Sequence, residues 1–177
     1  MDYYSEKQYL AQVDKEDNII GKVERWEAHE KQILHRAFTA CLLFNGQAIL
    51  QHRKHVLFDA VFDLTCSSHP LYVGDEIEPT ENAVYRAFER EWHVTKDQIT
   101  SPLLNKGSAY YQADDPNSEF GEHEVCYFYT AEIDHIPELN FEFAYGYSVV
   151  PVEKIKDPKF LASKIYAPWV PHCIALL

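Results

Sequence analysis

The sequence predicts an α/β fold of the layered α+β kind, with strands before and after one central helix. The first observation is the Asn45-Gly46 pair between two short apolar runs. It is typical of a β-hairpin, here over 36–53, because both residues tolerate a positive φ. The second is a helical period across 80–92, and the third is a set of short alternating segments after it. The length of 177 residues suits a single domain over 1–177 with a sizeable core.

Around the hairpin, the chain alternates between short strand patterns and polar segments. Residues 9–13 and 19–23 are expected to be strands, and the polar segment 14–18 between them is expected to be a turn. Residues 24–34 are polar without a clear period, so they are interpreted as a loop or a short helix. After the hairpin, residues 54–79 show no periodicity.

The central helix is expected to begin at Thr80, as the N-cap, and to continue to about Trp92. Its apolar face consists of Val84, Ala87, Phe88 and Trp92, and its other positions include Glu81, Tyr85, Glu89 and Arg90. The elements expected after it are strands at 108–112, 124–133 and 146–150, a turn at 114–118, a helical turn at 152–155 and a helix after Pro168.

The composition restricts the class of partner and the compartment. A net charge of −12 argues against nucleic acid or an anionic membrane as a partner. The N-terminus lacks the basic and apolar pattern of a signal peptide, and no stretch is long enough to span a bilayer. We therefore expect a cytoplasmic protein with reduced thiols. Its four cysteines lie far apart in the sequence: Cys41, Cys66, Cys126 and Cys173.

The six residues from Thr65 to Pro70 bring together a thiol, two hydroxyls and an imidazole. Histidine can bind a metal or transfer a proton near neutral pH, and Cys or Ser can act as a nucleophile or proton donor when a neighbour perturbs it. Because Pro70 ends regular structure, we expect His69 where a strand runs into a loop. The alternative is structural: a buried packing thiol and a histidine with satisfied hydrogen bonds.

Three histidines and two glutamates form a second set of candidate functional residues. Glu122 and Glu124 flank a histidine at the start of an expected strand, and residues i and i+2 of a strand share one face. Two carboxylates held together need a cation between them, or a proton on one of them. With His29, His35 and His69 they would form a five-ligand site that suits Mn²⁺, Zn²⁺ or Fe²⁺. The alternative is a solvated surface strand.

Five short motifs occur in a fixed order along the chain. They are His35-Arg36-Ala37-Phe38, Leu50-Gln51-His52-Arg53, Cys66-Ser67-Ser68-His69-Pro70-Leu71, Gly121-Glu122-His123-Glu124 and Ala167-Pro168-Trp169. In this order they resemble the type 1 isopentenyl-diphosphate isomerase family, over residues 10 to 172. The resemblance implies a Nudix fold, an α/β/α sandwich with a mixed sheet. It also implies a small-molecule prenyl diphosphate as substrate, and we expect a monomer or a weak homodimer.

The resemblance also implies two kinds of bound cation. One divalent metal (Mn²⁺, Zn²⁺ or Mg²⁺) would be bound by His29, His35, His69, Glu122 and Glu124. A Mg²⁺ ion would accompany the substrate diphosphate and be held by Glu91 on the central helix, while Arg25 and Arg53 would contact the diphosphate.

In the family chemistry, the double bond moves by protonation and deprotonation through a tertiary carbocation, so two acid–base groups flank the substrate. Glu124 matches one of them. The other is a cysteine in the family and Ser67 here, a poorer base than a thiolate, with Cys66 as the alternative if the loop shifts by one residue. Tyr111 matches a tyrosine that assists protonation. Trp169 matches an indole whose face stabilises the cation.

The sequence departs from the family pattern on the diphosphate side. A lysine and a Phe-Pro-Gly segment of the family are replaced by residues 54–60, and an arginine of the helix is replaced by Ala87. Diphosphate binding would then be rearranged through Lys54, Arg86 or Arg90.

Three other functions remain open. The altered segment 54–60 would suit a longer prenyl diphosphate, whose protonation would start a cyclisation. Nudix-type hydrolysis of a diphosphate is disfavoured, because two helix positions that carry glutamate in those hydrolases are Ala87 and Arg90 here, leaving Glu91. A binding module without turnover is disfavoured, because all five ligand residues are retained together with Tyr111 and Trp169.

Overall fold

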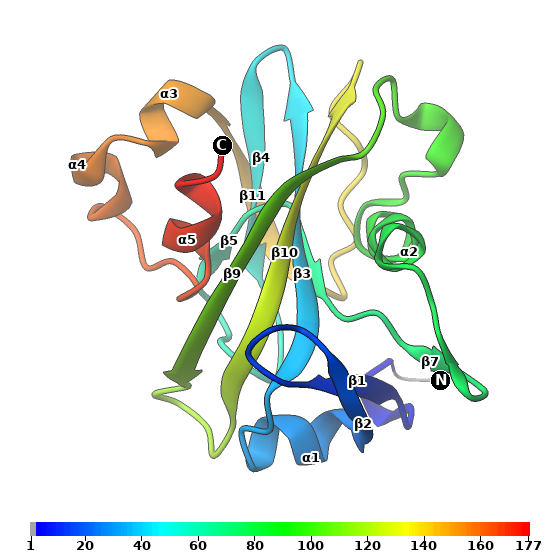
Figure 1. Ribbon diagram of the computed structural model, residues 1–177. Coiled ribbons are helices and arrows are strands. Elements are labelled where there is room, and N and C mark those ends of the chain that lie inside the picture. The colour runs from blue at the N-terminus through cyan, green and yellow to red at the C-terminus, as the bar shows by residue number, and fades with distance from the viewer. Residues whose placement is uncertain (1–2) are drawn as a thin grey trace.

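The computed structural model describes residues 3–177, and a mixed β-sheet forms its centre (Figure 1). Within the described residues the main sheet has nine strands, and a separate ribbon has two. The nine are β1 (Tyr9–Val13), β2 (Ile19–Glu24), β3 (His35–Phe44), β4 (Gln47–Arg53), β5 (Phe62–Asp63), β6 (Cys66–Ser68), β9 (Leu104–Asp114), β10 (Gly121–Ile133) and β11 (Ala144–Pro151). The ribbon consists of β7 (Tyr72–Val73) and β8 (Glu76–Ile77). The helices are α1 (Arg25–Glu30), α2 (Thr80–Trp92), α3 (Val152–Ile155), α4 (Pro158–Leu161) and α5 (Val170–Ile174), with 3₁₀ turns η1 (Tyr3–Ser5) and η2 (Lys96–Gln98).

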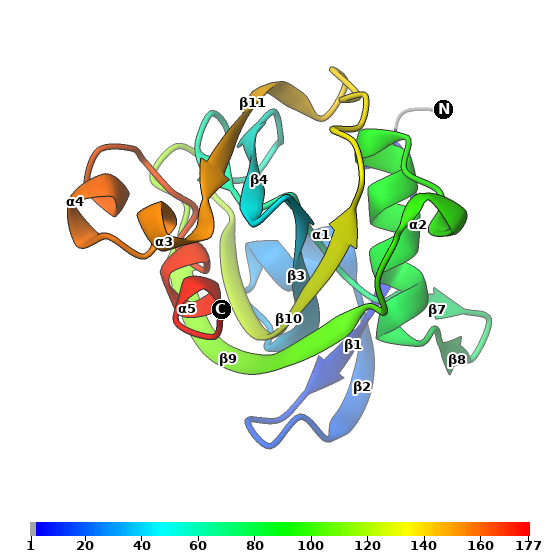
Figure 2. The same cartoon turned by 90° about the horizontal axis from the view of Figure 1, so that it is seen from above.

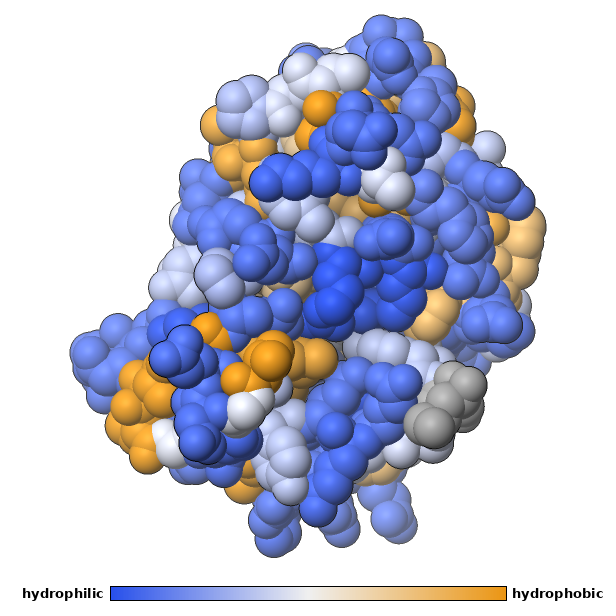
Figure 3. Space-filling model, turned by 90° about the vertical axis from the view of Figure 1, so that its right-hand side faces the viewer, coloured by the Kyte–Doolittle hydropathy of each residue, from blue (hydrophilic) through white to orange (hydrophobic). Residues whose placement is uncertain are grey.

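Helices cover both faces of the main sheet, which confirms the predicted α/β/α sandwich (Figure 2). On one face, α2 packs its predicted apolar residues into the core; Val84, Ala87, Phe88 and Trp92 are all 0% exposed. On the other face, α5 packs Val170 and Cys173 into a second cluster. The surface on the α2 side is mostly hydrophilic, as the outer face of an amphipathic helix requires (Figure 3). No helix within residues 3–177 combines the length and the apolar character needed to cross a bilayer.

The predicted hairpin is present, but its two strands separate close to the turn. Asn45 and Gly46 form the turn with φ of 50° and 72°, and β3 pairs with β4 at only two positions beside it. Farther from the turn, β6 pairs with β3 and β5 pairs with β4. The segment without a sequence period is therefore inserted into the opening of the hairpin, and it carries Ser67 and His69 to β3.

Several elements differ in extent from the sequence prediction. Strands β5 to β8 have two or three residues each, which is too short to produce a period. Strands β9 and β10 are longer than expected because they pair with each other from Asp114 and Gly121 to Leu104 and Thr130. The helix α4 lies in a stretch for which the sequence pattern predicts no element.

The two helix starts illustrate local capping. The polar segment before the hairpin contains α1, whose N-cap Glu24 accepts hydrogen bonds from the backbone N–H groups of Trp26 and Glu27 at 2.9 and 3.1 Å. Thr80 is the first helical residue of α2 and not its N-cap, so that prediction is wrong. Pro79 takes the cap position, where it needs no N–H partner.

We predict that Phe88→Ala destabilises the protein strongly, because it leaves a cavity between α2 and the sheet. The expected loss is about 3–5 kcal/mol of the free energy of unfolding, measured by urea titration. Glu89→Ala on the exposed side of the same helix should change it by less than about 0.5 kcal/mol. Equal losses in the two variants would contradict the assigned orientation of α2.

Candidate active site

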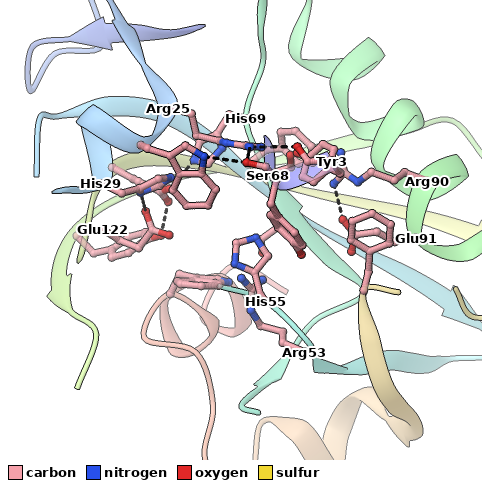
Figure 4. Close-up of a pocket in the computed structure, with 18 residues that line it drawn as sticks. Tyr3, Arg25, His29, Arg53, His55, Ser68, His69, Arg90, Glu91 and Glu122 are labelled. Carbon is pink, nitrogen blue, oxygen red and sulfur yellow. Dashed lines mark hydrogen bonds and ion pairs between the residues drawn. The ribbon is translucent and has the colours of Figure 1, made fainter. Parts of the chain in front are cut away.

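One pocket is lined by 18 side chains from distant parts of the chain (Figure 4). They include Tyr3 and Tyr4 of η1, Arg25, Trp26 and His29 of α1, Ser67 and Ser68 of β6, Arg90 and Glu91 of α2, Tyr111 of β9, Glu122 and Glu124 of β10, and Arg53, His69 and Trp169. The structure therefore brings most of the predicted site residues to one place.

The histidines and glutamates converge at one side of this pocket. One ligand atom each of His29, His35, His69 and Glu122 lies within 4.8 Å of the others. His35 Nε2 lies 3.2 Å from His69 Nε2, and His29 Nδ1 lies 3.1 Å from Glu122 Oε2. Glu124 Oε1 lies 3.1 Å from His69 Nε2 and 3.5 Å from His35 Nε2, so it adjoins the same group.

The strand register explains this convergence. β10 runs parallel to β3 with Glu124 paired opposite His35, and Glu122 lies two residues earlier on the same strand. His35 Nδ1 is 2.7 Å from the Ile33 carbonyl oxygen, an arrangement that places the proton on Nδ1 and leaves Nε2 free to act as a ligand. His29 comes from the last turn of α1, which packs on β10.

The protonation states fit a cation at this cluster. Burial lowers the pKa of His29 to about 4 and that of His69 to about 3, so both imidazoles are neutral at pH 7 and can act as ligands. Glu122 Oε2 is buried and accepts no hydrogen bond of good geometry from residues 3–177. Burial, followed by repulsion from Glu124, raises the pKa of Glu122 well above its usual value. This buried set of imidazoles and carboxylates is compatible with a divalent metal.

Ser67 and Cys66 point to opposite sides of β6. Ser67 lines the pocket, and its Oγ is 2.8 Å from Thr39 Oγ1. Cys66 is 0% exposed in the core against α2, and burial raises the pKa of its thiol well above the usual value. The structure therefore places Ser67, and not Cys66, at the pocket.

Tyr111 contacts Glu124, and Trp169 lies beside Tyr111. The Tyr111 hydroxyl donates a hydrogen bond to Glu124 Oε2, and burial raises the pKa of Tyr111 well above its usual value. Burial alone would raise the pKa of Glu124, but the contacts of its carboxylate with His35 and His69 outweigh burial and hold this pKa well below the usual range. The Trp169 ring lies 6.0 Å from that of Tyr111 and is 2% exposed.

The two arginines expected to bind diphosphate both line the pocket, but the protein already occupies many of their donors. Arg25 donates from Nη1 to Gln8 Oε1 at 2.8 Å, and from Nη2 to backbone carbonyls of the N-terminal segment. Arg53 donates from Nη1 to Asp63 Oδ2 at 2.9 Å and from Nη2 to the Leu57 carbonyl.

Two other predicted binding residues lie outside the pocket. Lys54 is exposed, and its Nζ is 3.4 Å from the Phe141 carbonyl oxygen. Arg86 donates to Glu78 at 2.6 Å and to the His69 carbonyl at 3.1 Å, so it supports the loop and does not line the pocket. These placements do not support a role for either residue in binding a substrate within this pocket.

Glu91, to which the resemblance assigns Mg²⁺, lines the pocket. Its Oε1 is paired with Arg90, and its Oε2 accepts a hydrogen bond from Gln51 Nε2 at 3.0 Å.

The sequence analysis did not single out Thr39 or Asp63, which contact residues that line the pocket. Thr39 had a detectable signal, because it is the one polar residue in the apolar run from 37 to 44. Asp63 lies in the segment without a period, where no pattern marks it.

Comparison with solved structures places this architecture in the Nudix class. The Deinococcus radiodurans protein DR0079 matches with a TM-score of 0.72 over 94% of this chain and 97% of its own, at 18% identity. A MutT Nudix hydrolase from Burkholderia pseudomallei matches with a TM-score of 0.57 over 81% of this chain and 98% of its own, at 17% identity. No family model matches the chain.

Curated relatives identify the family within that class. The isopentenyl-diphosphate Delta-isomerase of Haloarcula marismortui is 30% identical over 172 residues, covering 92% of this chain and 87% of the relative. The human isopentenyl-diphosphate delta-isomerase 2 is 32% identical over 135 residues, 68% of this chain, and the match spans 59% of the human protein. The chain belongs to the isopentenyl-diphosphate delta-isomerase family, a family of enzymes.

We predict that the chelator-treated protein loses stability as the pH falls from about 6.5 to about 4. In this range the unfolded chain binds a proton on His29 that the folded protein does not bind, so acid favours unfolding. The expected loss from His29 alone is up to roughly 3 kcal/mol, measured by urea titration at several pH values. His29→Gln should flatten this slope, whereas the exposed His135→Gln should not. A slope that is unchanged in His29→Gln would contradict a buried neutral imidazole.

Proposed function

We propose that this chain interconverts isopentenyl and dimethylallyl diphosphate by protonation and deprotonation of the alkene through a tertiary carbocation. The observation that carries the proposal is that the candidate metal cluster adjoins a pocket also lined by Ser67, Tyr111 and Trp169. Membership of the isomerase family supports the same reaction class.

Glu124 is the proposed acid–base group on one face of the substrate. Its Oε2 accepts from Tyr111, whose raised pKa keeps the hydroxyl protonated and able to relay a proton to Glu124. A divalent cation bound by His29, His35, His69, Glu122 and Glu124 would supply the positive charge that stabilises the two carboxylates. Three imidazole nitrogens favour Zn²⁺ or Mn²⁺ over Mg²⁺ at this position.

Ser67 is the proposed group on the opposite face. Its contact with Thr39 gives the hydroxyl a neighbour with which it can exchange a proton. A serine has no accessible anion near pH 7, so the reaction should be slower than with a cysteine. The buried indole of Trp169 would stabilise the carbocation by about 2 kcal/mol in a desolvated pocket. Arg25 and Arg53, which both line the pocket, would attract the diphosphate by their positive charge.

Hydrolysis of a diphosphate is the second candidate, because the fold is shared with Nudix hydrolases. It is disfavoured by α2, where Ala87 is buried, Glu89 is exposed and Glu91 is paired with Arg90. Too few free carboxylates remain there to hold the metals that activate water. Cyclisation of a longer prenyl diphosphate would use the same acid, and its product distinguishes it.

We predict that Glu124→Gln lowers the rate of isomerisation by 10²–10⁴-fold, because the variant lacks the proton-transfer group. The measurement is deuterium incorporation from D₂O into both five-carbon isomers, followed by mass spectrometry. Glu132→Gln, an exposed residue of the same strand, is the matched control. A deuterated cyclic product from a longer substrate would favour cyclisation, and release of phosphate would favour hydrolysis. Full activity of Glu124→Gln would refute the assigned role.

We also predict that Ser67→Cys raises the rate by about tenfold or more, because a thiolate is the stronger base. Cys66→Ala should change the rate by less than about twofold, because its thiol packs against α2. Loss of activity in Cys66→Ala at unchanged stability, with Ser67→Ala fully active, would reverse the two assignments.

A further inference from the structure

The guanidinium of Arg90 lies at the side of the pocket away from the candidate metal ligands His29, His69 and Glu122, which belong to what we call the histidine cluster (Figure 4). Its side chain is 14% exposed, and Nη2 pairs with Glu91 Oε1. The rings of Tyr3 and Phe143 lie near its central carbon, with centroids at 4.2 and 5.4 Å. The aromatic rings and the ion pair hold this cation in a fixed place at the pocket wall.

Arg90 has hydrogen-bond donors that the described part of the chain does not use. Its Nε and Nη1 atoms are buried and have no hydrogen-bond partner within residues 3–177. Arg25 also has an unpartnered Nε, but both of its terminal nitrogens, like those of Arg53, donate to protein acceptors. An unused buried guanidinium donor is costly, so these two atoms of Arg90 mark a place for an acceptor that residues 3–177 do not supply.

Glu91 is correspondingly poorly disposed to hold a second metal ion. One carboxylate oxygen is paired with Arg90, and the other accepts from Gln51 Nε2 at 3.0 Å. A guanidinium thus already provides the positive charge that Mg²⁺ would bring to this carboxylate. Unlike a magnesium ion, it offers directed donors to phosphate oxygens.

We infer that Arg90 binds a phosphate group of the diphosphate directly and replaces magnesium as the cation beside Glu91. This inference rests on the proposed function only in taking a diphosphate as the ligand. It assigns to Arg90 the part that the resemblance would give to Mg²⁺ on Glu91. The diphosphate would then lie toward α2, with the hydrocarbon toward the histidine cluster and Trp169.

The test is calorimetric titration of the protein with inorganic pyrophosphate in magnesium-free buffer. The wild type should bind, and Arg90→Gln should bind at least tenfold more weakly, because charge-assisted hydrogen bonds are lost. Arg90→Lys should recover only part of the affinity, since an ammonium keeps the charge but lacks the planar fork. Arg36→Gln, which removes an arginine paired with Asp17 away from the pocket, should bind like the wild type.

The variant Glu91→Gln distinguishes phosphate binding by Arg90 from magnesium binding by Glu91. If Arg90 binds the phosphate, this variant should bind pyrophosphate at least as tightly as the wild type, because the arginine is released from its carboxylate. If Glu91 instead holds magnesium, the wild type should need Mg²⁺ to bind, and Glu91→Gln should lose that binding. If Arg90→Gln does not fold, the double variant Arg90→Gln/Glu91→Gln replaces it, because this variant leaves no unpaired carboxylate. It should also bind pyrophosphate at least tenfold more weakly than the wild type.

Three outcomes would each overturn the inference. The first is wild-type affinity in Arg90→Gln or in the double variant. The others are a strict magnesium requirement in the wild type and no pyrophosphate binding at all. Pyrophosphate binding involves no turnover, so its outcome is independent of the isomerase assay. A chain that binds through Arg90 without moving a double bond would refute the proposed function and leave this inference standing.

Discussion

The pairing of β3 along both of its edges is the constraint on which the pocket depends. On one edge, parallel pairing with β10 sets Glu124 opposite His35. On the other edge, antiparallel pairing with β6 sets Ser67 opposite Thr39. A shift of either register by one residue would turn these side chains to the other face of the sheet. The early separation of β3 from β4 is what makes the second edge available, so the geometry of the hairpin and the contents of the pocket are linked.

The pocket contains buried ionisable groups, some of which form neutral ion pairs while others have no counter-charge among residues 3–177. Arg53 is paired with Asp63, and Arg90 with Glu91, so these two pairs are internally neutral. At the histidine cluster, the low pKa of Glu124 keeps this carboxylate charged beside the neutral imidazoles of His29 and His69, so the cluster has an excess of negative charge. Arg25 makes its hydrogen bonds to an amide and to backbone carbonyls, so none of these partners among residues 3–177 offsets its positive charge. Buried charges of this kind are tolerated when an opposite charge completes them. A metal cation bound at the histidine cluster would balance its negative charge, and an anionic substrate near Arg25 would balance the positive charge of that arginine.

The sequence predicts the parts of this structure that local patterns control. The turn at Asn45 needs only a tolerance of positive φ, and the buried face of α2 follows from its period. The residue types allow the candidate ligands to be named, but their spacing does not show that they meet, because the parallel pairing that joins His35 to Glu124 connects residues 89 positions apart. Nothing local marks the two-residue strand that carries Asp63. The position of Arg90 depends on how α2 and the N-terminal segment meet, so the helical pattern assigns it only to the polar side.

Strand geometry, and not the intrinsic reactivity of the side chains, determines which of Ser67 and Cys66 reaches the pocket. Side chains alternate along β6, so Ser67 faces the pocket while Cys66 faces the core beneath α2. His69 lies two residues after Ser67 and just past the end of the strand, and it reaches the same side. A one-residue slip that brought Cys66 into the pocket would also move His69 away from its contacts with His35 and Glu124. The chain cannot gain the more reactive thiol in this way without losing a candidate metal ligand, and the serine is held in the pocket by the geometry that completes the histidine cluster.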